Sequence, residues 1–279
     1  MKVLVLGHRG MLGQAIMKTW TDFEVIGADR QELDIAKPEE VTQALRTHQP
    51  KVVMNCAAYT GVDDCETHEL EADLINGTAV GHIAQACQAC DAILVHISTD
   101  YVFDGQQAAG YTENASTGPI NAYGRTKLHG EKELQAFCPE YYLIRTSWLY
   151  GPGGKNFVRT MLQLGQTKHE IKVVNDQHGK PTLTTDLSAF IKSLVLERAP
   201  YGTYHGINEG ATTWYDFARA IFTQARLSVN LVPCSSQEFP RPAQRPAWSI
   251  LLNTKRPKLR AWDVALRDYL AEINYPPAV

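Results

Sequence analysis

Three glycines near the start of the chain limit its possible folds more than any other feature. Gly7, Gly10 and Gly13 lie in GHRGMLG, which follows the apolar run VLVL and opens the helical pattern GQAIMKTW. Glycines at this spacing let the backbone turn tightly, approach a pyrophosphate and pack a helix closely on a sheet. The helix N-terminus then offers amides and a partial positive charge to phosphates. The sequence therefore predicts a dinucleotide site here, and Met11 and Leu12 are expected to line it with the glycines.

The second apolar run ends in an acidic residue, Asp29. An acid at the end of the next strand makes a glycine loop much stronger evidence for a dinucleotide, and it favours the free ribose 2′-hydroxyl of NAD. Two arginines, Arg30 beside it and Arg9 in the loop, could instead bind the 2′-phosphate of NADP. Asp34 completes the predicted cofactor contacts in this segment. These residues leave the choice between NADPH and NADH open.

Apolar runs alternate with helical patterns through the first 150 residues. This order is typical of βαβ units, and continuous apolar strands such as VVM and ILVHI indicate helices on both faces of a parallel sheet. The sequence predicts an α/β fold with a Rossmann-type doubly wound sheet in residues 1–150, including one helix through 70–90. Residues 151–279 are expected to form a smaller, mainly substrate-binding lobe, with some segments returning to the first domain. Helices are predicted around 156–165, 184–198 and 214–227.

Composition excludes several classes of function. The chain has 44% hydrophobic residues, a formal net charge of −3 and six cysteines. Without a basic stripe, a basic amphipathic helix or a long apolar run, neither nucleic acid nor a membrane is an expected partner. Six cysteines in a chain of this length, without a signal peptide, predict a cytoplasmic protein. Cys87 and Cys90 form a C-x-x-C, but no second Cys/His pair completes a zinc site.

A tyrosine and a lysine four residues apart, Tyr123 and Lys127, occur in NAYGRTKLHGEK. On a helix this spacing places both side chains on one face. An ammonium near a phenol favours the phenolate and can lower the phenol pKa by roughly 1 to 3 units. The pair predicts a group that exchanges protons near neutral pH.

Six motifs make the assignment more specific. They are NCAAYTGVDDCE (55–66), ISTDYVFDG (97–105), YGRTKLHGE (123–131), RTSWLYG (145–151), NFVRTML (156–162) and DQHGKPT (176–182). Together with the glycine loop, they resemble the dTDP-4-dehydrorhamnose reductase family of the short-chain dehydrogenase/reductase superfamily. The resemblance extends from the first strand to RPAWSILLNT at 245–254, and its motifs keep the expected order.

The resemblance implies roles for the residues that match. Tyr123 would donate a proton to a keto oxygen as hydride arrives from the nicotinamide. Lys127 would lower the phenol pKa and hold the nicotinamide ribose. Thr99 would hydrogen-bond the same keto oxygen, and Asp100 beside it would contact the substrate. The implied lining of the cofactor also includes Ala57, Ala58 and Tyr59.

The substrate residues implied by the resemblance are Trp148, Asn156 and Arg245. A flat indole ring can shield the reacting carbon and pack on an apolar sugar face. Asn156 and Arg245 are the candidates for the nucleotide diphosphate, because amides donate hydrogen bonds and guanidinium groups match phosphate oxygens. Arg241 is an alternative to Arg245.

The implied reaction is reduction of the 4-keto group of dTDP-4-dehydrorhamnose by NADPH or NADH, giving dTDP-L-rhamnose for cell-surface polysaccharide. Two alternatives stay open. One is a reductase of a related nucleotide-linked keto sugar, and the other is a non-catalytic NADP-binding subunit resembling the regulator of methionine adenosyltransferase. Fold and motif alone do not decide between them.

The resemblance also bears on metal binding and assembly. Part of the family pairs through a magnesium ion held by glutamates, and the corresponding places here carry Ala15 and Thr185. Glu272 would be the one carboxylate left, and Mg²⁺ is usually held through carboxylates. The expectation is a monomer or weak homodimer that no metal bridges, with no metal needed for turnover.

Overall fold

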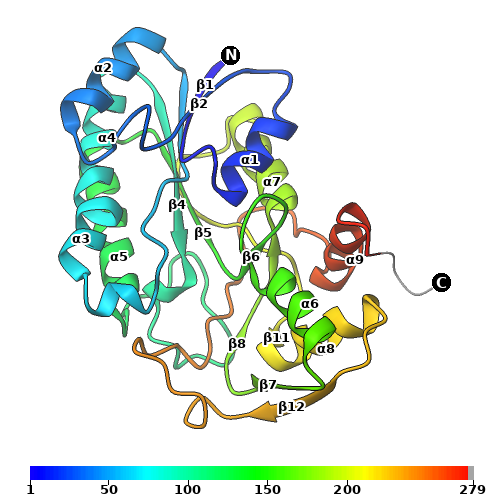
Figure 1. Ribbon diagram of the computed structural model, residues 1–279. Helices are drawn as coiled ribbons and strands as arrows, with labels where there is room; N and C mark the ends of the chain where they lie inside the picture. The colour runs from blue at the N-terminus through cyan, green and yellow to red at the C-terminus, as the bar shows by residue number, and fades with distance from the viewer. Residues whose placement is uncertain (276–279) are drawn as a thin grey trace.

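The computed structural model describes residues 1–275, and a six-stranded parallel sheet forms its centre (Figure 1). The strand order is β10-β5-β4-β3-β1-β2, with every neighbouring pair parallel. The bounds are β1 (Lys2–Leu6), β2 (Glu24–Ala28), β3 (Val52–Asn55), β4 (Ile93–Thr99), β5 (Tyr141–Thr146) and β10 (Gly202–His205). The predicted doubly wound α/β fold is confirmed.

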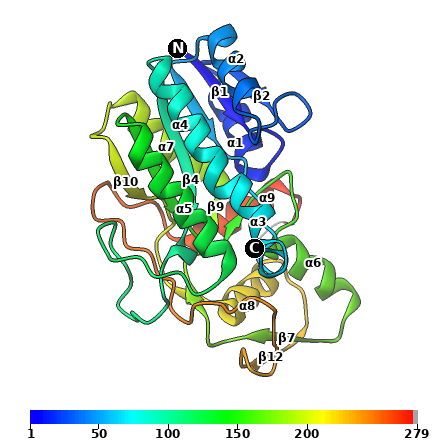
Figure 2. The same ribbon diagram turned by 90° about the vertical axis from the view of Figure 1, so that its left-hand side faces the viewer.

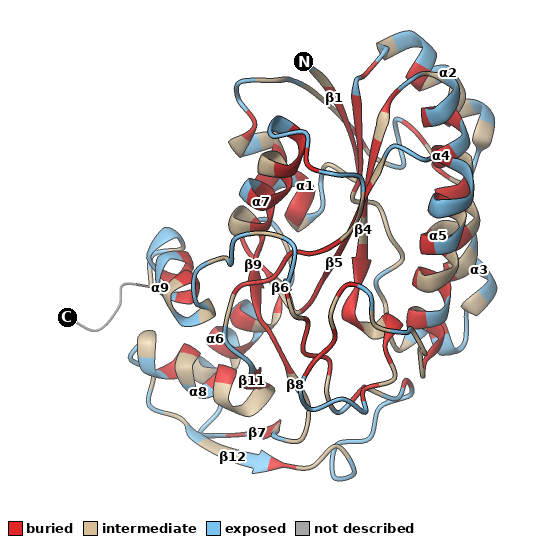
Figure 3. Cartoon of the chain, turned by 180° about the vertical axis from the view of Figure 1, so that it is seen from behind, coloured by how far each residue is buried: buried red, intermediate tan, exposed pale blue. Residues whose placement is uncertain are grey.

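Helices cover both faces of this sheet, which explains why its inner strands are apolar along their whole length (Figure 3). One face carries α2 (Pro38–His48), α4 (Ala79–Ala89) and α5 (Ala122–Phe137). The other carries α1 (Met11–Thr19) and α7 (Thr184–Leu196), so a helix from the second half of the chain completes the first half's core. Figure 2 shows α4 and α5 side by side over the sheet.

The chain reverses its direction of travel across the sheet after β2. From β1 it moves outward to β2, and it then returns to place β3 on the other side of β1. In open α/β sheets such a switch point leaves a crevice at the carboxyl ends of the strands, where ligands bind. The loops after β1, β3 and β4 all reach this crevice.

The second lobe packs below this edge of the sheet around its own apolar core (Figures 1 and 2). Its helices are α6 (Phe157–Thr167), α8 (Trp214–Gln224) and α9 (Trp262–Glu272). Its short strands are β6 (Leu149–Tyr150), β7 (Glu170–Val174), β8 (His178–Gly179), β9 (Thr182–Leu183), β11 (Thr212–Thr213) and β12 (Asn230–Cys234). Across residues 1–275 we find no helix with the length and apolar content needed to span a membrane.

The helix predicted through residues 70–90 is confirmed as one continuous helical stretch, but it contains a π-helical turn that the sequence did not predict. It consists of α3 (Glu69–Asp73), a π-helical segment (Leu74–Thr78) and α4. A π segment of this kind inserts a wide turn and often marks a functional region. Here it directs the buried side chain of Asn76 toward Tyr59: Asn76 Oδ1 accepts from Tyr59 N at 2.8 Å, and its Nδ2 donates to Tyr59 O at 3.0 Å.

Candidate active site

A cavity of about 610 Å³ opens at the carboxyl ends of the sheet strands. It brings together most residues that the sequence singles out, although they come from segments more than 100 positions apart. The lining includes Gly7, Gly10, Met11, Leu12, Gly13, Asp29, Arg30, Asp34, Ala57, Ala58, Tyr59, Thr99, Asp100, Tyr123, Lys127 and Trp148. Three predicted site residues are outside this lining: Arg9, Asn156 and Arg245.

The glycine loop is shaped by close backbone contacts. Gly7 has φ +75°, and a Cβ on it would lie 2.7 Å from the amide nitrogen of Ala57. A Cβ on Gly13 would lie 2.4 Å from the carbonyl oxygen of Gly7. Gly10 is the N-cap of α1 and has no side chain to cover the first amides of the helix. The loop therefore holds a helix N-terminus against the cavity without side chains in between.

Asp29, Arg30 and Arg9, at the glycine-loop end of the cavity, have different hydrogen-bond and ion-pair partners. Asp29 follows β2, and its Oδ1 accepts a hydrogen bond from the Arg30 amide at 2.9 Å. The Arg30 side chain is 79% exposed, with its Nε 3.8 Å from Asp34 Oδ2. Arg9 instead pairs with Glu32. Both arginines thus have an acidic neighbour, but the Arg30 side chain is the more exposed of the two and its contact is the longer.

Helix α5 presents Tyr123 and Lys127 to the same cavity, as their spacing predicts. Asn121 begins the helix, and its side chain accepts from the Gly124 amide at 2.8 Å. Lys127 is 2% exposed, and its Nζ donates to the carbonyl oxygen of Ile97 at 2.7 Å. The same Nζ lies 3.3 Å from Nε2 of His96.

The pKa values of this pair differ from the expectation. Burial raises the pKa of Tyr123, and the charge of Asp100 raises it further. Burial lowers the pKa of Lys127 to about 8, with Glu131 opposing the shift. Lys127 is directed to the Ile97 carbonyl and His96, so the expected lowering of the phenol pKa by Lys127 is not met in this arrangement. A phenol with a raised pKa keeps its proton at neutral pH, as a proton donor must.

Thr99 and Asp100 lie at the end of β4 beside the phenol. The Thr99 hydroxyl donates to Asp100 Oδ1 at 3.0 Å and accepts from the Tyr101 amide at 3.2 Å. Burial raises the pKa of Asp100 to about 7, against hydrogen bonds from Ser249 and Thr99 that lower it. The cavity therefore holds a phenol, a hydroxyl and a carboxyl whose protonation is sensitive to pH.

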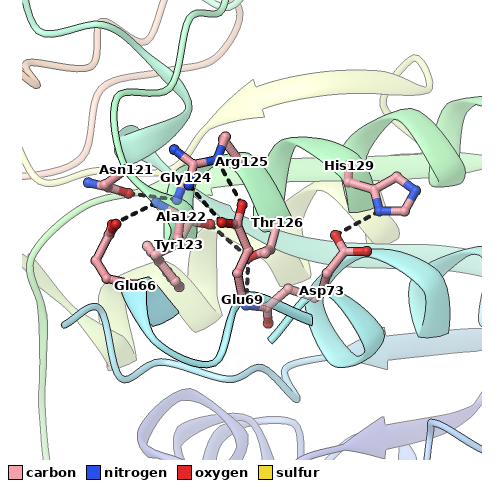
Figure 4. Close-up of polar contacts among 11 residues, drawn as sticks. Glu66, Glu69, Asp73, Asn121, Ala122, Tyr123, Gly124, Arg125, Thr126 and His129 are labelled. Atoms are coloured by element: carbon pink, nitrogen blue, oxygen red, sulfur yellow. Dashed lines mark hydrogen bonds and ion pairs between the residues drawn. The ribbon is translucent and has the colours of Figure 1, made fainter. Parts of the chain in front are cut away.

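Three acidic side chains from the segment before α4 bind α5 (Figure 4). Glu66 Oε1 accepts from the Ala122 amide at 2.8 Å. One turn further on, Glu69 receives two hydrogen bonds from the guanidinium of Arg125, each 2.8 Å long. Asp73 Oδ1 then lies 2.8 Å from Nδ1 of His129. These contacts hold the outer side of α5 and leave its other side to the cavity.

Trp148 lines the cavity in an uncommon conformation. Its φ is +46°, in the left-handed region that a bulky residue rarely adopts. Its ring stacks on Trp214 with centroids 3.6 Å apart, and a Cβ on Gly179 would lie 2.5 Å from that ring. The indole is thus held between a second tryptophan and a glycine. Trp214 was not predicted: it is the first residue of α8, and nothing in its local sequence indicates this contact.

The two residues predicted for the diphosphate are engaged within the protein. Asn156 begins α6: its Oδ1 accepts from the Arg159 amide at 3.0 Å, and its Nδ2 donates to the Gly151 carbonyl at 2.9 Å. Arg245 pairs with Asp63. Arg241 lies 2.9 Å from the other oxygen of Asp63. Asp63, within the motif GVDDCE, thus connects both candidate arginines.

The chain is similar in sequence and in structure to known proteins along nearly its whole length. The family model described as "RmlD substrate binding domain" matches residues 1–275. A probable dTDP-4,6-dihydroxy-2-methyloxan-3-one 4-ketoreductase of Streptomyces antibioticus is 39% identical, with 99% of this chain and 98% of that protein covered. A crystal structure of a dTDP-4-dehydrorhamnose reductase from Clostridium acetobutylicum is 43% identical with a TM-score of 0.95, covering 98% and 99% of the two chains. The reductase of Bacillus anthracis in complex with NADP is 37% identical with a TM-score of 0.95, covering 97% and 99%.

Proposed function

The chain belongs to the RmlD substrate binding domain family, that of the dTDP-4-dehydrorhamnose reductases, and on this premise we propose the reaction that it catalyses. It reduces the 4-keto group of dTDP-4-dehydrorhamnose with NADPH or NADH and gives dTDP-L-rhamnose. The observation that carries the proposal is the convergence of Thr99, Tyr123 and Lys127 on one cavity beside the glycine loop. A binding module without turnover has no need for this arrangement.

The residues at the glycine loop fit a dinucleotide. Gly7 and Gly13 leave no room for side chains, and the amides at the start of α1 face the cavity. Such a helix N-terminus favours a pyrophosphate. Asp29, Arg30 and Asp34 would hold the adenine ribose, and Ala57, Ala58 and Tyr59 would lie along the cofactor. The Asn76 side chain, which hydrogen-bonds both the amide and the carbonyl of Tyr59, would keep this last segment in place.

A nicotinamide cofactor held by these residues would supply hydride to the keto carbon of the substrate. Tyr123, protonated at neutral pH, donates its proton to the keto oxygen, and Thr99 orients that oxygen with its hydroxyl. Lys127 supports the phenol and the ribose when its Nζ turns toward the cavity. Trp148, held by Trp214, covers the sugar face and excludes water. Arg245 or Arg241 binds the diphosphate by exchanging Asp63 for phosphate oxygens, while Asn156 shapes the loop before α6.

The reaction is tested by NADPH oxidation, followed by absorbance, with the keto sugar nucleotide generated in situ. We expect turnover that depends on both the keto sugar and the cofactor. Formation of dTDP-L-rhamnose should be verified by chromatography, because a different product sugar would identify a related substrate. Cofactor binding without any turnover would contradict the proposal and favour a regulatory subunit.

The cofactor arginines give a further prediction. We expect the chain to accept both cofactors with a small preference for NADPH, because Arg30 is exposed and Arg9 can exchange Glu32 for a phosphate. Changing both arginines to alanine should raise the KM for NADPH roughly tenfold, about the contribution of one charge-assisted hydrogen bond, and leave the KM for NADH almost unchanged. Arg46→Ala, an exposed arginine of α2, is the matched control. Equal effects on both cofactors would show that neither arginine binds the 2′-phosphate.

Metal removal gives another prediction. Ala15 is buried, and Glu272 pairs with Lys18 at 2.7 Å, so the carboxylate near α1 already has a cation. Within residues 1–275, no three His, Cys, Asp or Glu side chains are placed to hold a metal ion. We expect EDTA to leave both the NADPH oxidation rate and the sedimentation coefficient unchanged. Loss of activity, or a dimer that dissociates on chelation, would contradict this.

We also propose how the chain is organised and where it acts. Residues 1–150 bind the cofactor, and residues 151–279 mainly bind the substrate, with β10 and α7 adding to the first unit's sheet and core. The protein works in the cytoplasm, as a monomer or a weak homodimer that no metal bridges. Its free cysteines and the absence of metal ligands at Ala15 and Thr185 support these proposals.

A further inference from the structure

Behind Lys127 lies a row of buried polar side chains to which the mechanism assigns no role. Asn55 and His96 are both 0% exposed, and they face each other as register partners on β3 and β4. Nδ2 of Asn55 lies 3.1 Å from Nδ1 of His96, and Nε2 of His96 lies 3.3 Å from Nζ of Lys127. The row therefore leads from the end of β3 directly to the lysine of the active site.

Strand alternation explains how these groups meet. Side chains two positions apart share a face of the sheet, so Asn55 lies with Val53, and His96 with Leu94, on the face covered by α4 and α5. Polar groups at such positions must be hydrogen-bonded, because burying an unpaired one costs about 1 to 3 kcal/mol. Each polar atom in the row therefore constrains the next.

The direction of each hydrogen bond can be followed from one fixed donor. The Ala57 amide can only donate, and it donates to Asn55 Oδ1 at 3.2 Å. The Asn55 NH₂ group therefore faces His96, and Nδ1 of His96 must accept. Burial lowers the pKa of His96 well below its usual value, so the ring is neutral and has one proton. That proton must be on Nε2, where it points toward Lys127.

A charged ammonium has no lone pair and cannot accept this hydrogen bond. A neutral amine can: its nitrogen accepts from His96 Nε2 and still donates to the Ile97 carbonyl. The position beside His96 therefore suits the neutral form of Lys127. The charged form keeps the Ile97 carbonyl as one acceptor, but its other protons need acceptors away from His96, and the open direction is the cavity, where the phenol of Tyr123 lies.

We propose that Asn55 and His96 form a buried relay that fixes the His96 tautomer and so directs the charged form of Lys127 toward the active-site cavity. His96 and Asn55 are positioning residues, since neither lines the cavity. The relay also joins the lysine to Ala57, whose amide belongs to the segment that lines the proposed cofactor site. The inference rests on the proposed function only in giving Lys127 a part in turnover.

Other charges near Lys127 also change the pKa of its amino group. Glu131, one turn further along α5, favours the ammonium, and Cys56 after β3 does so when ionised. Burial opposes them and outweighs them, so the pKa of Lys127 falls to about 8. The neutral amine is thus accessible at mildly alkaline pH, where its bond with His96 can be observed.

NMR of the full-length protein, without cofactor or substrate, tests the relay. With ¹⁵N-labelled histidine, His96 should show the Nε2–H tautomer both above and below the titration of Lys127. The lysine is followed through the ¹³Cε signal of labelled lysine, and His96→Gln and Lys127→Met assign the two signals. An Nδ1–H tautomer in the native chain would overturn the proposal, whether or not the protein reduces a keto sugar.

Asn55→Val removes the amide that fixes the His96 tautomer and places a β-branched residue, which suits a strand, at this position. Without the Asn55 amide, His96 can carry its proton on Nδ1, and Nε2 can then accept from the ammonium of Lys127. The midpoint of the Lys127 titration should therefore rise by about 1 pH unit. Asn253→Val removes another buried amide, one that donates to the Pro257 carbonyl and accepts from the Arg256 amide, and it should leave both signals unchanged. An unchanged midpoint in Asn55→Val, or the same shift in both variants, would overturn the relay.

Discussion

Tyr123→Phe should lower kcat by about 10² to 10⁴, the usual size of a general-acid contribution. The change removes one oxygen from a side chain whose raised pKa keeps it protonated at neutral pH. It leaves the ring, which packs edge-on against Tyr101 with centroids 5.9 Å apart. The measurement is NADPH oxidation under conditions where chemistry limits the rate, judged by single-turnover kinetics.

The affinity for the cofactor separates chemistry from binding in this variant. Tyr123→Phe should change the Kd for NADPH little, because the proposed cofactor contacts lie mainly at the glycine loop and Asp29. Tyr101→Phe is a matched control, since it removes a phenol oxygen from the neighbouring ring. Near-full turnover of Tyr123→Phe would show that another group donates the proton, and Asp100 would then be the first candidate because its pKa is about 7.

The fold could be predicted because its signals are local in the chain. The apolar strands, the glycine loop and the turn to α1 each lie within a few residues, and the structure confirms the doubly wound sheet that they indicate. The π-helical segment at Leu74–Thr78 could not be predicted in this way. Its wide turn is stabilised by Asn76 binding Tyr59 and Thr126, residues 17 and 50 positions away. Helical periodicity contains no information on such partners.

The site residues, like the fold, could be predicted only where the signal is local in the sequence. Motifs marked Thr99, Tyr123, Lys127 and Trp148, and the structure places all four on one cavity. The groups that hold them were missed, because they are recognised only once strands and helices are packed. His96 precedes the motif residue Thr99 by three positions, but its contact with Lys127 spans 31. Trp214 supports Trp148 from α8, far along the chain.

A buried ion pair beneath the site should give the largest stability effect. Glu131 on α5 and Arg145 on β5 have side chains 2% and 6% exposed, and they share two hydrogen bonds of 2.6 and 2.9 Å. Ser98 donates to the same carboxylate at 2.5 Å. Arg145→Met would leave Glu131 buried with this hydroxyl alone. We expect the free energy of unfolding to fall by about 3 to 5 kcal/mol, measured by urea denaturation followed by circular dichroism.

The loss of stability should depend on how far the ion pair is buried, and not on its number of hydrogen bonds. Arg125 allows this to be tested with a matched substitution. Arg125 also makes two hydrogen bonds to a glutamate, Glu69, but the two side chains are 46% and 42% exposed. Arg125→Met should therefore cost less than about 1 kcal/mol, since water replaces the lost partner. Removing both buried charges, in Glu131→Leu with Arg145→Met, should cost less than Arg145→Met alone, because no unpaired charge then stays in the interior. Equal losses for Arg125→Met and Arg145→Met would show that burial does not govern the cost.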